Sequence, residues 1–348
     1  MIEHIIVNWQ DKMFILWLRT CCLLVIMMVL IGGLTRLSGS GLSIVEWKPV
    51  TGVVPPLNSG EWLVEFAKYQ TSPEFQQNNS DMSLSNFKSI YWMEYIHRLS
   101  GRITGLLFLL PLIFFSFIGR IKNKDMPTYI SVLGLFALQG FMGWYMVKSG
   151  LEDNPYVSPF RLANHLFIAI VIYSLLFWQL MKNNFHILLL GKNNNFKYIK
   201  ILSLVVLGLL FCQIYLGGIV AGLGGGLVYN SFPLMGEGLV PAELSRNFID
   251  CDFFYNPVFV QFVHRIIAFL LFVMICFLVI LLIRTHYIRL RIVAVAIILA
   301  AILQITIGIL TLLYMVPIVP ALMHQLGAII LLSCVLWCYF ILYSDSQI

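Results

Sequence analysis

Long apolar runs separated by short polar breaks dominate the hydrophobic pattern of this chain. A membrane-spanning helix needs about 20 mostly apolar residues, and eight runs of the sequence meet that length. They begin near Met13, His97, Tyr129, Leu162, Ile199, Pro257, Ile292 and Pro320. The pattern therefore predicts an all-α integral membrane protein with eight transmembrane helices, whose even number places both termini on one side.

The composition indicates that lipid, rather than water, surrounds most of this chain. Of the 348 residues, 60% are AVILMFWYC and 11% are charged, and the mean hydropathy is +0.89. These values exclude a water-soluble fold, a disordered chain, a collagen and a disulfide scaffold. The net charge of +6 indicates no nucleic-acid partner, because the Lys and Arg residues are dispersed between the apolar runs. Six of the seven Cys lie in apolar runs and Cys251 stands alone in a polar segment, so no CxxC motif exists.

Basic residues mark the connections that face the cytoplasm. The connections after the second, fourth and sixth runs contain Arg120, Lys122 and Lys124; Lys182, Lys192, Lys197 and Lys200; and Arg284, Arg289 and Arg291. By the positive-inside rule these connections and both termini are cytoplasmic, while 37–95, 152–160, 223–255 and the turn at 317–320 face outward. The first run has no small-residue cleavage site and the chain has no Arg-rich presequence. We therefore expect a retained first helix in a bacterial inner membrane.

The sequence contains an internal repeat of four spans. IHRLSGRITGLLF from Ile96 matches VHRIIAFLLF from Val263, LQGFMG from Leu138 matches LQITIG from Leu303, ANHL from Ala163 matches LMHQ from Leu322, and GGLTRLSGSGL from Gly32 resembles GGIVAGLGGGL from Gly217. Because each repeat holds an even number of spans, the halves 1–190 and 191–348 have the same orientation. We expect two parallel four-helix bundles related by an axis along the membrane normal.

Four of the seven His residues lie near the start of an even-numbered span, and therefore at a similar depth toward the outer face: His97, His165, His264 and His324. The other three, His4, His186 and His286, lie in polar segments and are interpreted as solvated. A single His at this depth has an ordinary explanation as an interfacial hydrogen-bonding residue. Four of them, paired by the repeat, favour metal ligation, because ionisable groups in a bilayer are costly and neutral imidazole is a common ligand.

The spacing of these imidazoles favours haem iron over zinc or copper. The two His of each half are 68 and 60 residues apart, on separate spans and among apolar neighbours. Two imidazoles that face each other across a bundle suit the axial positions of a haem. We predict one haem between His97 and His165 and a second between His264 and His324, with propionates toward the outer surface.

Three arginines lie close to these histidines in the sequence. Arg161, four residues before His165, is a candidate propionate partner because it lies on the same helix face. Arg98 and Arg265 each follow a His by one residue and point away from it, so they are interpreted as interface cations.

The two halves differ at one ionisable position. Glu94 lies three residues before His97, and its counterpart in the second half is Gln261. A carboxylate beside an iron ligand can move protons at the edge of the macrocycle. The asymmetry indicates a reactive first half and a permanent cofactor in the second. The alternative is a surface Glu paired with Arg98 or Lys88.

Several strings resemble the haem A synthase family, in the branch shared by alphaproteobacteria and mitochondria. They are GGLTRLSGSGLSIVEWKP from Gly32, PP at Pro55, EYIHRLSGR from Glu94, NH at Asn164, FVHR from Phe262 and MHQ from Met323. The resemblance implies oxidation of the C8 methyl of haem O to the formyl of haem A for terminal oxidase assembly, with haem b as cofactor. It implies that His97 and His165 bind the substrate haem, that Glu94 is catalytic, and that His264 and His324 bind haem b. A related branch has an outer-loop cysteine pair, whereas this chain offers Cys251 alone there.

The expected partners are haem O, the lipid bilayer, a supplier of haem O and an electron-transfer partner. A bundle open to lipid can admit the isoprenoid tail of haem O without exposing it to water. The aromatic residues of the long outer segment either cover the haem edge or form an interfacial belt. Two other classes remain open: a cytochrome-b-like di-haem electron carrier, and a transporter built from repeats, for which broken helices and midplane charge pairs are expected.

Overall fold

The computed structural model describes residues 9–152, 154–184, 196–246 and 253–345, so His4, His186 and Cys251 lie outside the described residues. Eight helices in these ranges are long and apolar enough to cross a membrane, which confirms the predicted class. They are α1 (Trp9–Leu37), α4 (Leu84–Phe117), α5 (Met126–Ser149), α6 (Pro159–Asn184), α7 (Phe196–Gly222), α9 (Pro257–Ile283), α10 (Ile288–Leu313) and α11 (Ile318–Asp345). Short helices α2 (Ser59–Gln70), α3 (Pro73–Asn78) and α8 (Ala242–Arg246) lie in the connections.

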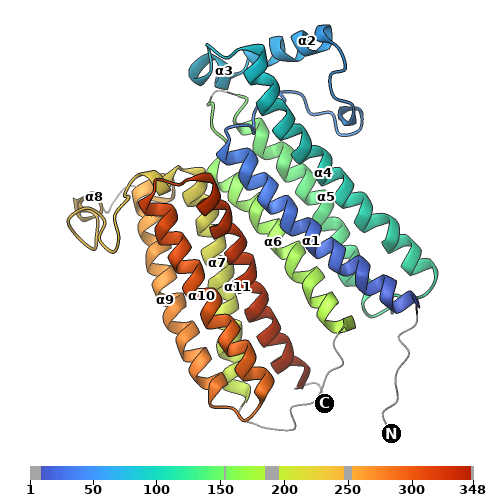
Figure 1. Ribbon diagram of the computed structural model, residues 1–348, viewed down its shortest axis with the longest axis vertical. Helices are drawn as coiled ribbons and strands as arrows, with labels where there is room; N and C mark the ends of the chain where they lie inside the picture. Colours follow the sequence, from blue (N-terminus) through green and yellow to red (C-terminus); the bar gives the residue numbers. More distant parts are fainter. Residues whose placement is uncertain (1–8, 153, 185–195, 247–252, 346–348) are drawn as a thin grey trace.

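The long helices form two groups that lie side by side (Figure 1). One group contains α1, α4, α5 and α6, and the other contains α7, α9, α10 and α11. The groups join where α6 packs on α7 and where α11 packs on α1 and α6. Helix α1 begins and α11 ends at the same end of the molecule, as an even number of spans requires (Figure 1).

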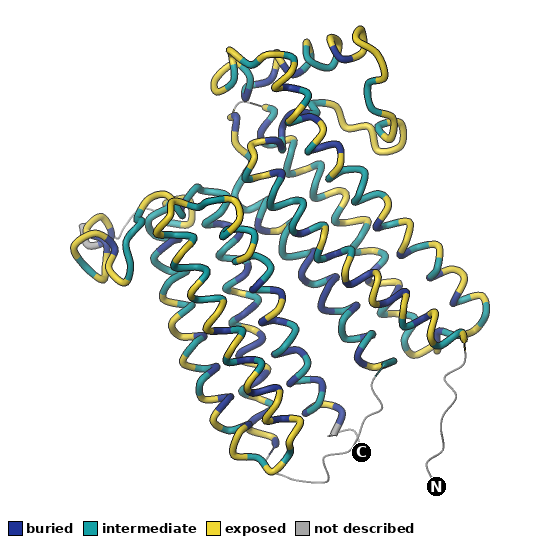
Figure 2. Tube along the Cα trace, viewed as in Figure 1, coloured by how far each residue is buried: buried dark blue, intermediate teal, exposed yellow. Residues whose placement is uncertain are grey.

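Apolar side chains cover the outside of both groups. Figure 2 shows exposed residues along the outward faces and buried residues where the helices face one another. Among the exposed side chains are Leu23, Phe117 and Phe277, each more than half accessible. In water this surface would be costly, whereas in a bilayer it contacts acyl chains.

The second spanning helix begins earlier than the hydropathy pattern indicates. It starts at Leu84 instead of near His97, and the Ser83 hydroxyl caps it by accepting a hydrogen bond from Asn86 N–H. A helix of 34 residues is about 50 Å long, well beyond the ~30 Å hydrocarbon core, so its first turns project from the bilayer. The extension places Glu94 and His97 on one continuous helix.

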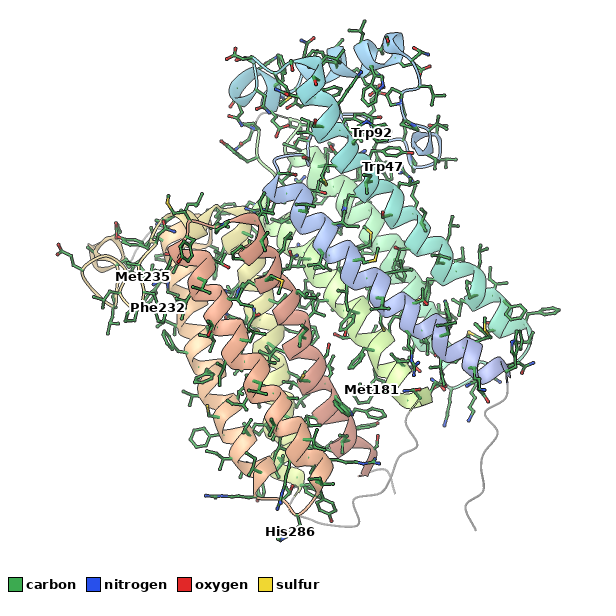
Figure 3. All side chains as sticks on the ribbon, viewed as in Figure 1. Trp47, Trp92, Met181, Phe232, Met235 and His286 are labelled. Atoms are coloured by element: carbon green, nitrogen blue, oxygen red, sulfur yellow. The ribbon has the colours of Figure 1, made fainter. Side chains whose placement is uncertain are left out.

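The outer segment between α1 and α4 folds into a small cap with an aromatic core. Trp62 and Tyr69 of α2 form this core together with Phe87, Tyr91 and Tyr95 from the first turns of α4. Trp47 ties the segment to α5 through Trp144, with ring centroids 5.4 Å apart. Figure 3 labels Trp47 and Trp92 beside this cap, and the exposed His286 at the opposite end of the molecule.

A buried carboxyl lies inside the cap. Glu74 is 9% exposed, and the Tyr69 hydroxyl donates a hydrogen bond of 3.1 Å to its Oε2. Asn79 in turn donates to the Tyr69 oxygen at 2.8 Å. Burial raises the pKa of the Glu74 carboxyl from 4.5 to about 7.

The cap should become less stable as pH rises from the Glu74 pKa of the unfolded chain to the higher Glu74 pKa of the folded protein. Between about pH 4.5 and 7 the folded state binds more protons at Glu74 than the unfolded state does. We expect Glu74→Gln to abolish this loss, which amounts to at most roughly 3 kcal/mol at about 1.4 kcal/mol per pKa unit. Thermal unfolding midpoints of both proteins at pH 5 and pH 8 test this, and parallel pH dependences would contradict it.

Candidate functional site

The four predicted histidines occupy equivalent positions in the two helix groups. His97, His165, His264 and His324 lie in the N-terminal halves of α4, α6, α9 and α11, and each is half-buried. Within each group the two imidazoles lie close enough to interact electrostatically, His97 with His165 and His264 with His324. The fold therefore brings together the pairs that the sequence predicts.

Each imidazole packs against a glycine on the preceding helix. A Cβ placed on that glycine would lie within 3.3 Å of the histidine Cε1: 3.1 Å for Gly32 and His97, 3.2 Å for Gly143 and His165, 3.3 Å for Gly217 and His264, and 2.7 Å for Gly308 and His324. Any larger residue would displace the ring, so glycine is what allows these helices to approach at this depth.

Buried polar atoms without partners gather at the same four places. Among the described residues, they include Nδ1 of His97, His165 and His264, and Oε1 of Gln139, Gln213 and Gln304. Buried polar groups normally have hydrogen-bond partners, so these unpaired atoms mark polar positions inside an otherwise apolar interior. Two imidazoles from two different helices, close together in an apolar interior, are a donor set that fits the iron of one haem in each group. Within the described ranges, no three His, Cys, Asp or Glu side chains converge as a conventional metal site would require.

The carboxylate of Glu94, near the His97 ring, accepts four hydrogen bonds. It is 2% exposed, and its Oε2 accepts hydrogen bonds from Ser43 Oγ at 2.6 Å and from Ile44 N–H at 2.9 Å. Its Oε1 accepts from Arg98 Nη2 at 2.6 Å and Nε at 3.0 Å. The carboxylate and Arg98 both interact electrostatically with the His97 ring. The pairing with Arg98 matches the structural alternative considered for Glu94, yet the carboxylate is buried one turn before His97 rather than on the surface.

The second half replaces this ion pair with neutral contacts. Gln261 donates to the carbonyl oxygen of Tyr229 at 3.0 Å, and its own Oε1 is buried without a partner. Arg265 donates to the carbonyl oxygens of Tyr229, Ser231 and Leu234. Arg98 likewise donates to the carbonyl oxygens of Ile44 and Glu46. Both arginines therefore hold an outer loop onto a helix, and only the first also neutralises a buried carboxylate.

Comparison with known proteins agrees with this arrangement over nearly the whole chain. Residues 15–336 match the family model described as "Cytochrome oxidase assembly protein". A protein named "Heme A synthase" from Rickettsia bellii (strain RML369-C) is 53% identical over 323 residues, which is 93% of this chain and 96% of the relative. The chain belongs to the haem A synthase family. Relatives of the same name from Rickettsia africae (strain ESF-5) and Rickettsia felis (strain ATCC VR-1525 / URRWXCal2) are each 50% identical. The match to the R. africae protein covers 97% of this chain and 100% of the relative, and the match to the R. felis protein covers 96% and 99%.

Family membership confirms the resemblance drawn from the motifs at Gly32 and Glu94 and its alphaproteobacterial branch.

Arg161, the candidate propionate partner, contacts the end of α5. Its Nη1 donates to the Tyr145 carbonyl oxygen at 2.7 Å, and its guanidinium stacks 3.7 Å from the centroid of the Tyr145 ring. Arg161 therefore caps the end of α5, and a role toward haem propionates stays a prediction.

Sequence reasoning did not single out the partners of the key side chains. These are Ser43, which holds Glu94, the glycines opposite the histidines, and the glutamines Gln139, Gln213 and Gln304. The repeat carried a signal for most of them, since LQGFMG and LQITIG align Gln139 with Gln304 and Gly143 with Gly308. No comparable pattern marks Ser43, because its contact with Glu94 joins residues 51 positions apart.

A side chain at a ring-facing glycine should expel haem from that half. We expect Gly217→Val on α7 to lower the haem content of the second half by about tenfold, since overpacking costs about 1–3 kcal/mol. The matched control is Gly208→Val on the same helix, where a Cβ meets nothing within 4 Å. Haem per protein, from absorbance of the purified variants, tests this. Equal haem loss in the two variants would contradict it.

Proposed function

We propose that this haem A synthase family member oxidises the C8 methyl group of haem O to the formyl group of haem A, for terminal oxidase assembly. The observation that carries the proposal is the pairing of imidazoles in two equivalent helix groups, of which one holds a buried carboxylate beside its ligand and the other does not. The family assignment supports the substrate, and the asymmetry supports the division of labour between the halves.

In this proposal, His97 and His165 bind the substrate haem O. His264 and His324 hold haem b, which supplies one-electron redox chemistry when bound. Glycines opposite the imidazoles leave room for both rings, and the surrounding apolar side chains exclude water from them. The isoprenoid tail of haem O would extend into lipid beside the first helix group.

Glu94 is the proposed proton acceptor of the reaction. Converting a methyl into a formyl group removes four electrons, and protons must leave the substrate edge with them. The four hydrogen bonds from Ser43, Ile44 and Arg98 fix the carboxylate one helical turn before His97. Arg98 would balance the charge while Glu94 is ionised and would keep it oriented toward the first site.

The membrane setting follows from the same assignment. We propose a bacterial inner-membrane protein with cytoplasmic termini, because the connections that carry Arg120, Lys124 and Arg284 lie at the end where α1 begins. We also propose that residues 1–190 and 191–348 are parallel repeats, on the strength of the four equivalent glycine–histidine contacts. A supplier of haem O and an electron-transfer partner complete the expected partners.

Removing the charge of Glu94 should stop oxidation without emptying the site. We expect Glu94→Gln to reduce conversion of haem O to haem A by about 100-fold, the low end of what a proton-transfer group contributes, and to accumulate haem O or a hydroxylated intermediate. Chromatography of extracted pigments measures both. Glu152→Gln, an exposed outer carboxylate paired with Lys148, is the control. Unchanged conversion in Glu94→Gln would exclude a catalytic role.

The two halves should hold different haems. We expect His97→Ala to remove haem O and haem A from the purified protein while haem b stays, and His264→Ala to remove haem b. Pigment extraction from each variant, compared with wild type, reads the sites separately. A di-haem electron carrier would instead contain two equivalent, tightly bound haems b, and each substitution would remove one of them.

A further inference from the structure

Three of the four histidines have a glutamine amide at Nε2. The Gln139, Gln213 and Gln304 amide nitrogens lie 3.2, 3.1 and 3.5 Å from Nε2 of His165, His264 and His324, respectively. Because an amide NH₂ only donates, Nε2 is the acceptor, and the contact uses the lone pair that an iron would take. Each glutamine precedes the glycine opposite the same histidine by four residues and so lies one turn away on the same helix.

The fourth histidine has a methionine in this position. Four residues before Gly32, the helix α1 carries Met28, whose thioether has no N–H to donate. Its Cε lies 3.5 Å from where a Cβ on Gly101 would be, one turn after His97 on α4. Met28 therefore occupies the space beside α4 and offers His97 no hydrogen bond.

The glutamines of the second half have a further acceptor. Gln213 also donates to the His264 carbonyl oxygen at 3.0 Å, and Gln304 to the His324 carbonyl oxygen at 2.9 Å. These contacts tie α7 to α9 and α10 to α11 at the depth of the rings. When iron takes Nε2, each amide retains its carbonyl partner, so the tie persists in the loaded protein.

We propose that Gln213 and Gln304 are positioning residues that keep a permanent haem in the second half. In the first half, Met28 gives α1 and α4 no such tie at the depth of the rings, where Trp17 of α1 joins α4 only nearer the other end through the Leu107 carbonyl oxygen, so this site can exchange its haem. This inference rests on the proposed function, in which haem O must enter and haem A must leave at every turnover while haem b stays bound.

The packing of the first half agrees with a site that opens. Along α5, the buried residues are Tyr129 and Val132, both within the first two turns at the end away from the histidines. Along the equivalent helix α10, buried residues extend from Leu290 to Ala301. The buried residues of α5 therefore stop 11 residues before Gly143, whereas those of α10 stop seven residues before Gly308, so packing holds α10 closer to its ring.

Haem exchange from each half can be measured separately. Protein loaded with haem b at one site, in variants that lack both histidines of the other half, would be mixed with excess apomyoglobin, and transfer followed at the Soret band. We expect faster transfer from the first half than from the second. Met28→Gln should slow transfer from the first half by about threefold to tenfold, the equivalent of one net hydrogen bond. Gln213→Met should accelerate transfer from the second half by a similar factor.

Met28→Leu is the matched control, because leucine has the size of methionine and also lacks a donor, so transfer should match that of the parent protein. The ferric Soret position should stay constant among the variants, as it reports ligation by two imidazoles. If Met28→Gln does not fold, the reciprocal Gln213→Met still decides the question.

Equal transfer rates from the two halves, or rates insensitive to these substitutions, would overturn the inference while leaving the proposed function intact. A protein that binds haem b in neither half would overturn both.

Discussion

The close contact between a glycine and an imidazole, repeated four times, is the constraint on which the rest of this structure depends. Each helix pair can approach at the depth of the rings because glycine has no Cβ, and each ring is thereby held at a fixed place near the outer end of its group. The same contacts explain why both groups are lined there by polar atoms inside an otherwise apolar interior. Leucine and valine at these positions would give an ordinary helix bundle with a filled core.

This constraint also governs how the two groups meet. In α1 and α7, the ring-facing glycine is followed by a second glycine that faces the other group. A Cβ on Gly33 would lie 2.2 Å from the Gln325 Oε1, beside His324, and one on Gly218 would lie 3.0 Å from the Ala163 Cα, near His165. Each glycine pair therefore contacts a ring of its own half and the neighbourhood of a ring in the other half. In each half, two consecutive glycines therefore set both the approach of the helix to its own ring and its approach to the other group.

Hydropathy and the repeat were sufficient to predict the eight helices and to single out the four histidines as candidates, because each depends on local composition or on a pattern that occurs twice. They were insufficient for α4, whose first turns are polar and leave the bilayer, so no apolar run marks them. The cap was missed for a related reason: its core joins Trp62 and Tyr69 of the short helix α2 to Phe87 of α4, and only folding brings the two helices together. Glu94 and its partner Arg98 were found from their places beside His97, but the partners Ser43 and Ile44 come from the other end of a long connection, and only folding brings them to Glu94.

The asymmetry between the halves is concentrated at a few positions on a common frame. Both halves present imidazoles in the same way and both use an arginine to hold an outer loop, so neither feature distinguishes a substrate site from a cofactor site. Two positions differ. The first half has a charged Glu94 where the second has a neutral Gln261, and it has Met28, which cannot donate a hydrogen bond, where the second has the donor Gln213. The first half has gained a buried ion pair, which is costly unless fully hydrogen-bonded, and it satisfies that pair with loop residues Ser43 and Ile44. The longer connection between α1 and α4 thus supplies the hydrogen bonds that a buried carboxylate requires, and the half with the neutral Gln261 does without them.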